Sequence, residues 1–166
     1  MRKVVMLSLA ICIPALAVSN VLPTAVAAPA CTIEGSAGGE VIIGTRGRDV
    51  ICARGGGDWI DPRGGNDVVL AGPGDDFVRG SAGSDILKGD LGRDYLVGGP
   101  GADQLFGAAG SDRCLNLRDN VSGNDRASGG PGYDNGTRDP GDMFTGIEQI
   151  PTTQPYCRPA PPRPPV

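Results

Sequence analysis

A period of nine residues runs through the middle of this chain and constrains its fold more than any other feature. Aspartates stand at every ninth position from Asp49 to Asp112, and Glu40 takes the same place one repeat earlier. A glycine stands two residues before each of these acids, and Ile, Val, Leu or Cys stands two residues after it. Residues 35–115 therefore form contiguous nine-residue units, and 120–128 and 129–137 resume the pattern after a four-residue insertion. Such a period predicts stacked repeats.

The residue types of one unit predict its local structure. Glycine populates left-handed backbone conformations, so the first six residues can form a tight turn whose carbonyl groups point inward. The last three residues form one short strand with its middle, apolar side chain on one face. A single unit buries nothing alone, but stacked units can pair their strands about 4.8 Å apart. Aromatic residues make up only 4% of the chain, against 28 glycines, so a conventional core of large side chains is not expected.

The unit "GGPGADQLF" (98–106) resembles the glycine-rich nonapeptide of the RTX (haemolysin-type) calcium-binding family, G-G-x-G-x-D-x-U-x, at every defined position. The resemblance implies an all-β fold, a parallel β-roll. Such a roll is a two-sheet β-solenoid with two nonapeptides per turn. It also implies Ca²⁺ between successive turns, so that acids 18 residues apart share an ion. The candidate metal ligands are Asp49, Asp58, Asp67, Asp76, Asp85, Asp94, Asp103 and Asp112.

The chemistry of the unit supports calcium independently of the resemblance. Ca²⁺ takes six to eight oxygen ligands from carboxylates and backbone carbonyls, and a glycine turn with an aspartate supplies both. The alternative for each aspartate is a side chain that only caps its own turn. Eight aspartates in register favour calcium. Whether Glu40, Asp125 and Asp134 bind it stays open, because Glu40 is longer and the other two lack a large apolar neighbour.

Both ends of the chain differ from the repeats. Arg2 and Lys3 precede an apolar run over 4–18 and small residues, which predicts a secretory signal peptide over 1–30. Pro14 interrupts the apolar run, so we do not expect the run to be a membrane anchor. Once the signal peptide is removed, we expect no membrane span. Residues 31–150 are then the calcium-binding β-roll, with an irregular C-terminal cap over 138–150. Residues 151–166 are a proline-rich tail. The protein is accordingly expected to be secreted and extracellular.

Four cysteines remain once the signal peptide is removed. An even count in an exported chain suggests two disulfides, and three pairings are possible. The pairs nearest in sequence, Cys31–Cys52 and Cys114–Cys157, are favoured.

Composition also limits the function. The chain has no histidine, which excludes His-based triads, and its formal charge of −4 makes nucleic acid a poor partner. A secreted hydrolase with an RTX domain is a competing hypothesis, but no segment outside 35–150 is long enough for a catalytic domain. We therefore expect a non-enzymatic structural or interaction module.

Three aromatic residues share one position in alternate units: Trp59, Phe77 and Tyr95. Their spacing of 18 predicts a row on one outer face of the roll, exposed to solvent. Such a row suggests a second function, an adhesin or carbohydrate-binding module with an extracellular glycan or protein partner. The other interpretation is cross-strand pairing that stabilises the sheet.

Overall fold

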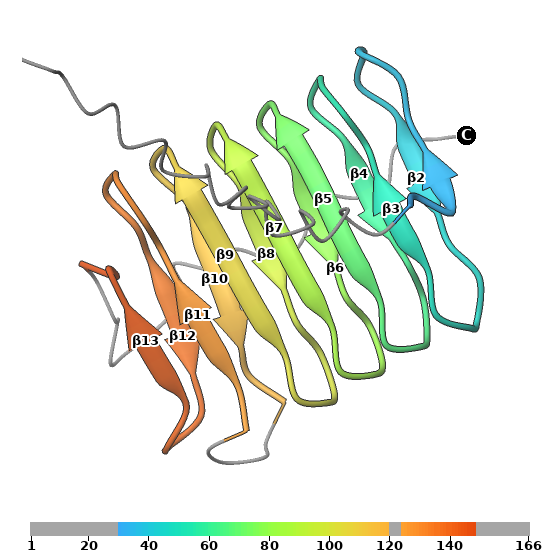
Figure 1. The fold of residues 1–166 in the computed structure, drawn as a ribbon. Coiled ribbons are helices and arrows are strands. Elements are labelled where there is room, and N and C mark those ends of the chain that lie inside the picture. Colours follow the sequence, from blue (N-terminus) through green and yellow to red (C-terminus); the bar gives the residue numbers. More distant parts are fainter. Residues whose placement is uncertain (1–29, 120–123, 149–166) are drawn as a thin grey trace, which may run out of the picture.

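The computed structural model describes residues 30–119 and 124–148, which form a parallel β-solenoid of about six turns (Figure 1). No helix occurs in these two segments, and so none there could cross a membrane. The predicted signal peptide, apart from Ala30, and the proline-rich tail lie outside the described residues. The strands are β1 (Ile33–Glu34), β2 (Val41–Ile43), β3 (Val50–Cys52), β4 (Trp59–Asp61), β5 (Val68–Pro73), β6 (Phe77–Arg79), β7 (Ile86–Leu91), β8 (Tyr95–Val97), β9 (Gln104–Ala109), β10 (Cys114–Leu117), β11 (Arg126–Ser128), β12 (Gly136–Arg138) and β13 (Met143–Thr145).

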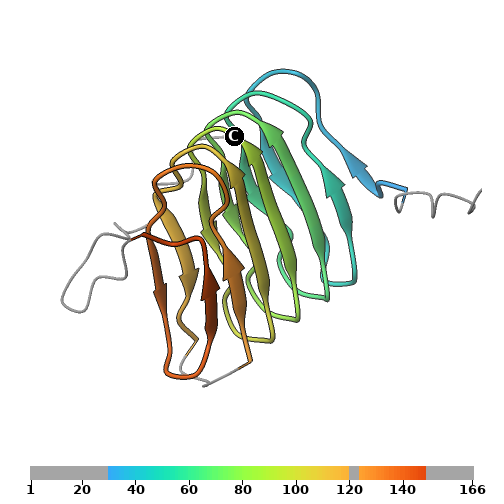
Figure 2. The ribbon, with the colours of Figure 1, turned by 60° about the vertical axis from the view of Figure 1, so that its left-hand side comes forward.

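The strands alternate between two sheets, as two nonapeptides per turn require. Sheet A has the order β1-β3-β5-β7-β9-β11-β13, and sheet B has the order β12-β10-β8-β6-β4-β2. All pairings are parallel, and Ile60 stands opposite Val78 while Leu87 stands opposite Leu105. Figure 2 shows the two sheets as opposite walls of one flattened coil. The predicted β-roll and its spacing of 18 residues are confirmed.

The core between the sheets is one apolar side chain wide in each unit. The residue two positions after the acid points inward, as the sequence predicts, and the members of this column are at most 7% exposed: Ile42, Ile51, Ile60, Val69, Val78, Leu87, Leu96 and Leu105. Ala53 and Ala71 fill the narrow corners of the same cluster. Because each unit contributes so little apolar area, burial of this column stabilises the fold less than an ordinary core would.

The inward column shifts by one residue at β10. We expected Cys114 to occupy the inward position, but Cys114 stands opposite Tyr95, and Leu115 stands opposite Leu96. Arg113 is thus an extra residue in this half-turn. Leu115 is fully buried in the core cluster, and its apolar side chain offers a physical reason for the shift.

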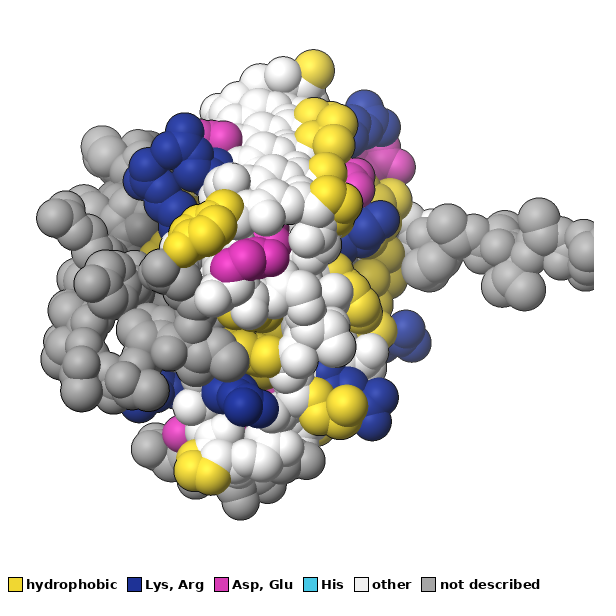
Figure 3. All heavy atoms as spheres, turned by 90° about the vertical axis from the view of Figure 1, so that its left-hand side faces the viewer, with side chains coloured by type: hydrophobic (Ala, Val, Ile, Leu, Met, Phe, Trp, Pro, Cys, Tyr) yellow, Lys and Arg dark blue, Asp and Glu magenta, His cyan; other side chains and the backbone are white. Residues whose placement is uncertain are grey.

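The C-terminal end is more regular than an irregular cap. β13 pairs in parallel with β11, so sheet A continues for one more strand. Phe144 and Ile147 pack against the core, and the Phe144 ring occupies the space that a side chain at Gly136 would need. Seen from this end, the surface shows backbone and uncharged polar side chains with hydrophobic, basic and acidic side chains interspersed (Figure 3). Ile150, the third apolar residue of the predicted cap, lies outside the described residues.

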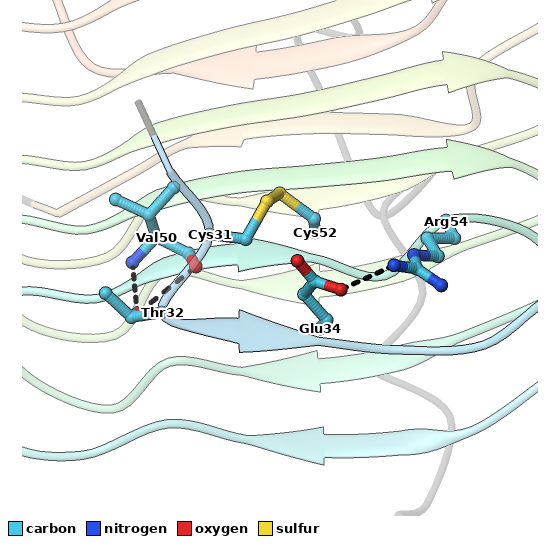
Figure 4. The surroundings of a disulfide bond; sticks show 6 residues. All are labelled: Cys31, Thr32, Glu34, Val50, Cys52 and Arg54. Carbon is cyan, nitrogen blue, oxygen red and sulfur yellow. Dashed lines mark hydrogen bonds and ion pairs between the residues drawn. A yellow bond between two sulfur atoms is a disulfide. The ribbon is translucent and has the colours of Figure 1, made fainter. Parts of the chain in front are cut away.

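A disulfide fixes the first strand. Cys31 is bonded to Cys52 with a Cα–Cα distance of 5.8 Å, which confirms one predicted pair (Figure 4). Thr32 donates its hydroxyl to the Val50 carbonyl beside it. Cys114 is disulfide-bonded as well. Its predicted partner Cys157 lies outside the described residues, so that pair stays a prediction.

The three aromatic residues form the predicted row. The ring centroids of Trp59 and Phe77 are 5.8 Å apart, and those of Phe77 and Tyr95 are 5.0 Å apart. The expected exposure is wrong for Phe77, which is only 5% exposed and has a ring on each side of it.

The row generates a prediction about cross-strand coupling. A double-mutant cycle with Trp59→Ala and Phe77→Ala should give a coupling energy of about 0.2–1 kcal/mol, the range for cross-strand pairs. The measurement is urea unfolding of each variant in calcium. Val68 belongs to sheet A, so a cycle that combines Trp59→Ala with Val68→Ala should give a coupling energy close to zero. Equal coupling in both cycles would contradict the two-unit turn.

A second prediction concerns two glycines at the same place in their units. Gly92 has a φ of +134°, and a Cβ there would lie 1.8 Å from the Gly74 carbonyl oxygen. Gly92→Ala should therefore cost more than about 1 kcal/mol of unfolding free energy. Gly47→Ala is the matched control, because a Cβ at Gly47 meets nothing nearer than Thr45 Oγ1 at 3.9 Å. Equal losses in urea unfolding would show that the close approach of the turns does not matter.

Candidate metal centre

The repeat aspartates form two hydrogen-bonded ladders along the roll. In each ladder, the Oδ1 atom of one acid accepts the backbone N–H of the acid one turn earlier. Asp76 accepts from Asp58 at 2.7 Å, and Asp94 accepts from Asp76 at 3.0 Å. The predicted pairs 18 residues apart are thus brought together. One ladder runs Glu40–Asp58–Asp76–Asp94–Asp112–Asp134–Glu148, and the other runs Asp49–Asp67–Asp85–Asp103–Asp125–Asp142.

The ladders extend beyond the residues that the sequence predicts. Asp125 and Asp134 are at most 1% exposed and continue the ladders, rather than lying in an irregular cap. Asp142 and Glu148 complete them, and sequence reasoning missed both. The sequence signal for Asp142 is Phe144, because an apolar residue stands two positions after the acid, as in the other units. Asp142 follows Asp125 by 17 residues and not by 18, so it falls outside the regular period. Glu148 carries the same signal in Ile150.

The first turn and the inner turns differ in whether the second carboxylate oxygen of the acid has a hydrogen-bond partner. Asp49 Oδ2 accepts the Thr45 N–H at 2.7 Å, and Glu40 Oε2 accepts the Ser36 N–H at 2.7 Å. Further along, the second oxygen is buried without a hydrogen-bond partner in nine aspartates: Asp58, Asp67, Asp76, Asp85, Asp94, Asp103, Asp112, Asp125 and Asp134. A buried carboxylate oxygen without a partner is costly, so these nine atoms mark where a cation would bind.

The backbone of the inner turns explains why these oxygens lack a partner. The residue four positions before the acid has a positive φ in every described unit from Arg54 to Gly130. Arg63 has a φ of 78° and Ala108 a φ of 75°, although neither is a glycine. Ser36 and Thr45 occupy the same place without a positive φ, and there the N–H reaches the carboxylate. The left-handed residue therefore takes away the donor that would satisfy the acid.

Burial makes the inner carboxylates weak acids. Desolvation raises the pKa of Asp94 and Asp103 to about 7, and hydrogen bonds from the backbone offset only part of this. Desolvation also raises the pKa of four others to about 6: Asp76, Asp85, Asp112 and Asp125. Negative charge on neighbouring acids of the same ladder raises these pKa values further. A cation between the turns would remove this penalty on the charged form.

Backbone carbonyls of the glycine turns lie close to the next turn. A Cβ at Gly101 would be 1.7 Å from the Gly83 carbonyl oxygen, and one at Gly110 would be 1.6 Å from that of Gly92. No compact group of three or more His, Cys, Asp or Glu side chains occurs within residues 30–119 and 124–148. A cation here must therefore combine carboxylate oxygens with carbonyl oxygens. That donor set is all oxygen, which fits Ca²⁺.

Comparison with known families agrees with this donor set. Residues 34–69, 63–96 and 79–114 match the RTX calcium-binding nonapeptide repeat. Residues 34–114 belong to the RTX calcium-binding nonapeptide repeat family. No curated protein and no solved structure matches the chain. RTX repeats are calcium-binding structural modules, so membership implies Ca²⁺ as the ion of this β-roll.

The raised pKa values predict how the metal-free RTX roll responds to pH. The folded pKa values of about 6 to 7 lie above the ordinary value of 3.8, so the folded chain binds more protons than the unfolded chain between these values. The contribution of these groups to the stability of the metal-free fold should therefore be greatest below about pH 3.8, fall as pH rises to about 6 to 7, and level off above that. Circular dichroism in calcium-free buffer from about pH 5 to about pH 8 checks this. A β signal that strengthens with rising pH would contradict it.

Proposed function

We propose that this protein is a secreted calcium-binding module whose repeats bind Ca²⁺ between successive turns and fold on binding. It serves as a structural or interaction module and not as an enzyme. One observation carries the proposal: nine buried aspartate oxygens without partners stand in register in two ladders. A solenoid with this many unpaired carboxylates is costly to fold alone, and a ligand that binds only the folded state stabilises it by mass action.

The proposed ligands are the eight aspartates of the contiguous repeats, from Asp49 to Asp112. We add Asp125 and Asp134, because each has a buried Oδ2 atom without a partner. Asp49 differs, since Thr45 already donates to its second oxygen, and we expect the first turn to bind calcium more weakly than the inner turns. Backbone carbonyls of the glycine turns complete the coordination. The affinity should be that of an extracellular module, on the order of 10⁻⁴–10⁻³ M.

Secretion is part of this proposal. The basic and apolar start of the chain supports a signal peptide over 1–30, and the Cys31–Cys52 disulfide suits an oxidising compartment. After its removal, the β-roll over 31–150 and the proline-rich tail over 151–166 would form the mature protein.

Carbohydrate binding by Trp59, Phe77 and Tyr95 is the weaker candidate. Phe77 is only 5% exposed, and its neighbours cover both faces of its ring. A sugar ring needs an open aromatic face to stack on. Binding of the full chain to a glycan array would be needed to revive this function.

The experiment that tests calcium-dependent folding compares two adjacent aspartates. Asp76→Asn keeps the size of the side chain but removes charge from a buried ladder position shared with Asp58 and Asp94. Asp75→Asn is the matched control, because the Asp75 carboxylate is exposed and lies outside both ladders. In calcium titrations followed by circular dichroism, Asp76→Asn should shift the midpoint to higher calcium and lower the number of ions bound. Asp75→Asn should leave both nearly unchanged.

Two outcomes would contradict the proposed function. One is a full β spectrum of the wild-type chain in excess chelator at neutral pH. The other is an equal shift of the calcium midpoint in the two variants, which would point to general charge screening and not to sites between turns.

A further inference from the structure

The outer face of sheet B carries a row that ends in a cysteine. Trp59, Phe77 and Tyr95 stand opposite one another on β4, β6 and β8, and Cys114 stands opposite Tyr95 on β10. Neighbouring strands are about 4.8 Å apart, so the row is continuous. Cys114 thus lies at the end of an aromatic strip.

Phe77 and Cys114 of this row are buried, whereas Val50 is the one buried residue at the matching described positions of sheet A. In the roll, each sheet has one face toward the core and one face toward the outside (Figure 2). On sheet A, Ile86 occupies the same position after its acid and is 38% exposed. On sheet B, Phe77 is 5% exposed and Cys114 is fully buried. Burial also raises the pKa of the Tyr95 hydroxyl. Phe77 and Cys114 are therefore covered, although both stand in the row on the outer face of sheet B.

The disulfide of Cys114 indicates which segment of the chain lies near this row. Cys31 and Cys52 are bonded to each other, and Cys114 is bonded too. The chain has five cysteines, so only Cys12 and Cys157 are left as partners. Cys12 belongs to the signal peptide that we propose is removed. Removal of the signal peptide would leave Cys157 as the partner, in agreement with the predicted pair, and Cys157 lies in a segment with seven prolines and no acidic residue, 151–166.

We propose that the proline-rich segment 151–166 docks on the outer face of sheet B. Cys157 anchors it to Cys114, and residues 158–166 lie across Tyr95, Phe77 and Trp59. Proline-rich segments bind aromatic strips well, because an extended polyproline helix is already ordered and its rings stack on aromatic faces.

The dimensions and the direction of the chain suit this docking. From Cys114 to Trp59 the row spans three strand spacings, about 14 Å, which about five residues of polyproline helix cover. Nine residues follow Cys157. Glu148 accepts the N–H of Asp134 next to β12, and sheet B continues from there through β10, β8, β6 and β4, so a tail that enters at this end would meet Cys114 before the aromatic residues. The aromatic strip is then occupied by the protein's own tail, and a glycan would have to displace it.

The first experiment maps the disulfide in the mature, non-reduced protein. Proteolysis and mass spectrometry should give a peptide that joins Cys114 to Cys157. A Cys114 found free, or joined to any other cysteine, would overturn the proposal. This measurement does not depend on calcium, so its result is independent of the proposed function.

The second experiment uses Trp59, the single tryptophan of the chain. In calcium, deletion of 158–166 and Cys157→Ser should each raise the quenching of Trp59 by acrylamide and shift its emission to the red. The matched control is the double variant Cys31→Ser and Cys52→Ser, which opens the other disulfide on sheet A and should leave Trp59 unchanged. Circular dichroism confirms that each variant has folded. Unchanged quenching in the folded deletion variant would overturn the proposal.

Wild-type protein supplies a measurement that needs no variant. Hydroxyl-radical labelling of the folded chain should spare Tyr95 relative to Tyr133, which is 51% exposed. Equal labelling of the two tyrosines would show that the strip is open. Protection of Tyr95 that falls on dilution would assign a second copy of the chain as the occupant, and so would also overturn the proposal.

Discussion

The hydrogen bond from the backbone N–H of one acid to the carboxylate of the acid one turn later is the interaction on which this structure depends. It requires a short side chain inside the roll, and aspartate reaches the next turn while keeping the turns close. Because the bond repeats once per unit, it fixes both the period of nine and the pairing at 18. The stacking of the turns also takes each carboxylate out of water, and this desolvation raises its pKa more than the hydrogen bond lowers it.

The glycines follow from the same close packing of turns. Where a Cβ would lie under 2 Å from a carbonyl of the previous turn, as at Gly83, only glycine fits. At another glycine, a Cβ on Gly89 would lie 2.1 Å from the unpaired Asp94 Oδ2 and 2.9 Å from the Gly107 carbonyl oxygen, so both kinds of oxygen border the same space. Few large side chains are needed, because a cation held by such oxygens, in our proposal, supplies cohesion that one Leu or Val per unit does not.

The sequence predicts the roll, the inward column, the pairing at 18 and the Cys31–Cys52 bond, because each depends on residue type at a fixed spacing. It does not predict how far the ladders continue. We judged Asp125 and Asp134 by their lack of a large apolar neighbour, whereas the ladder needs only an acid and a backbone N–H. The sequence also does not predict that Leu115, and not Cys114, occupies the inward position of β10, since either side chain can fill it. The repeat pattern also does not predict that Phe77, on the outer face of its sheet, is only 5% exposed.

The ends of the ladders show how such a stack can stop. An end turn has no neighbour to share an ion with, so its acids need partners from the chain itself. Asp49 takes the Thr45 N–H, Glu40 takes the Ser36 N–H, and Asp142 takes the Asp139 N–H at 2.9 Å. Glutamate at both ends of one ladder adds the reach that aspartate lacks. Terminal repeats of solenoids commonly carry such polar, self-satisfied caps. Within residues 30–119 and 124–148, the unpaired aspartate oxygens lie in the inner turns, and the dependence on an ion is thereby concentrated in the middle of the roll.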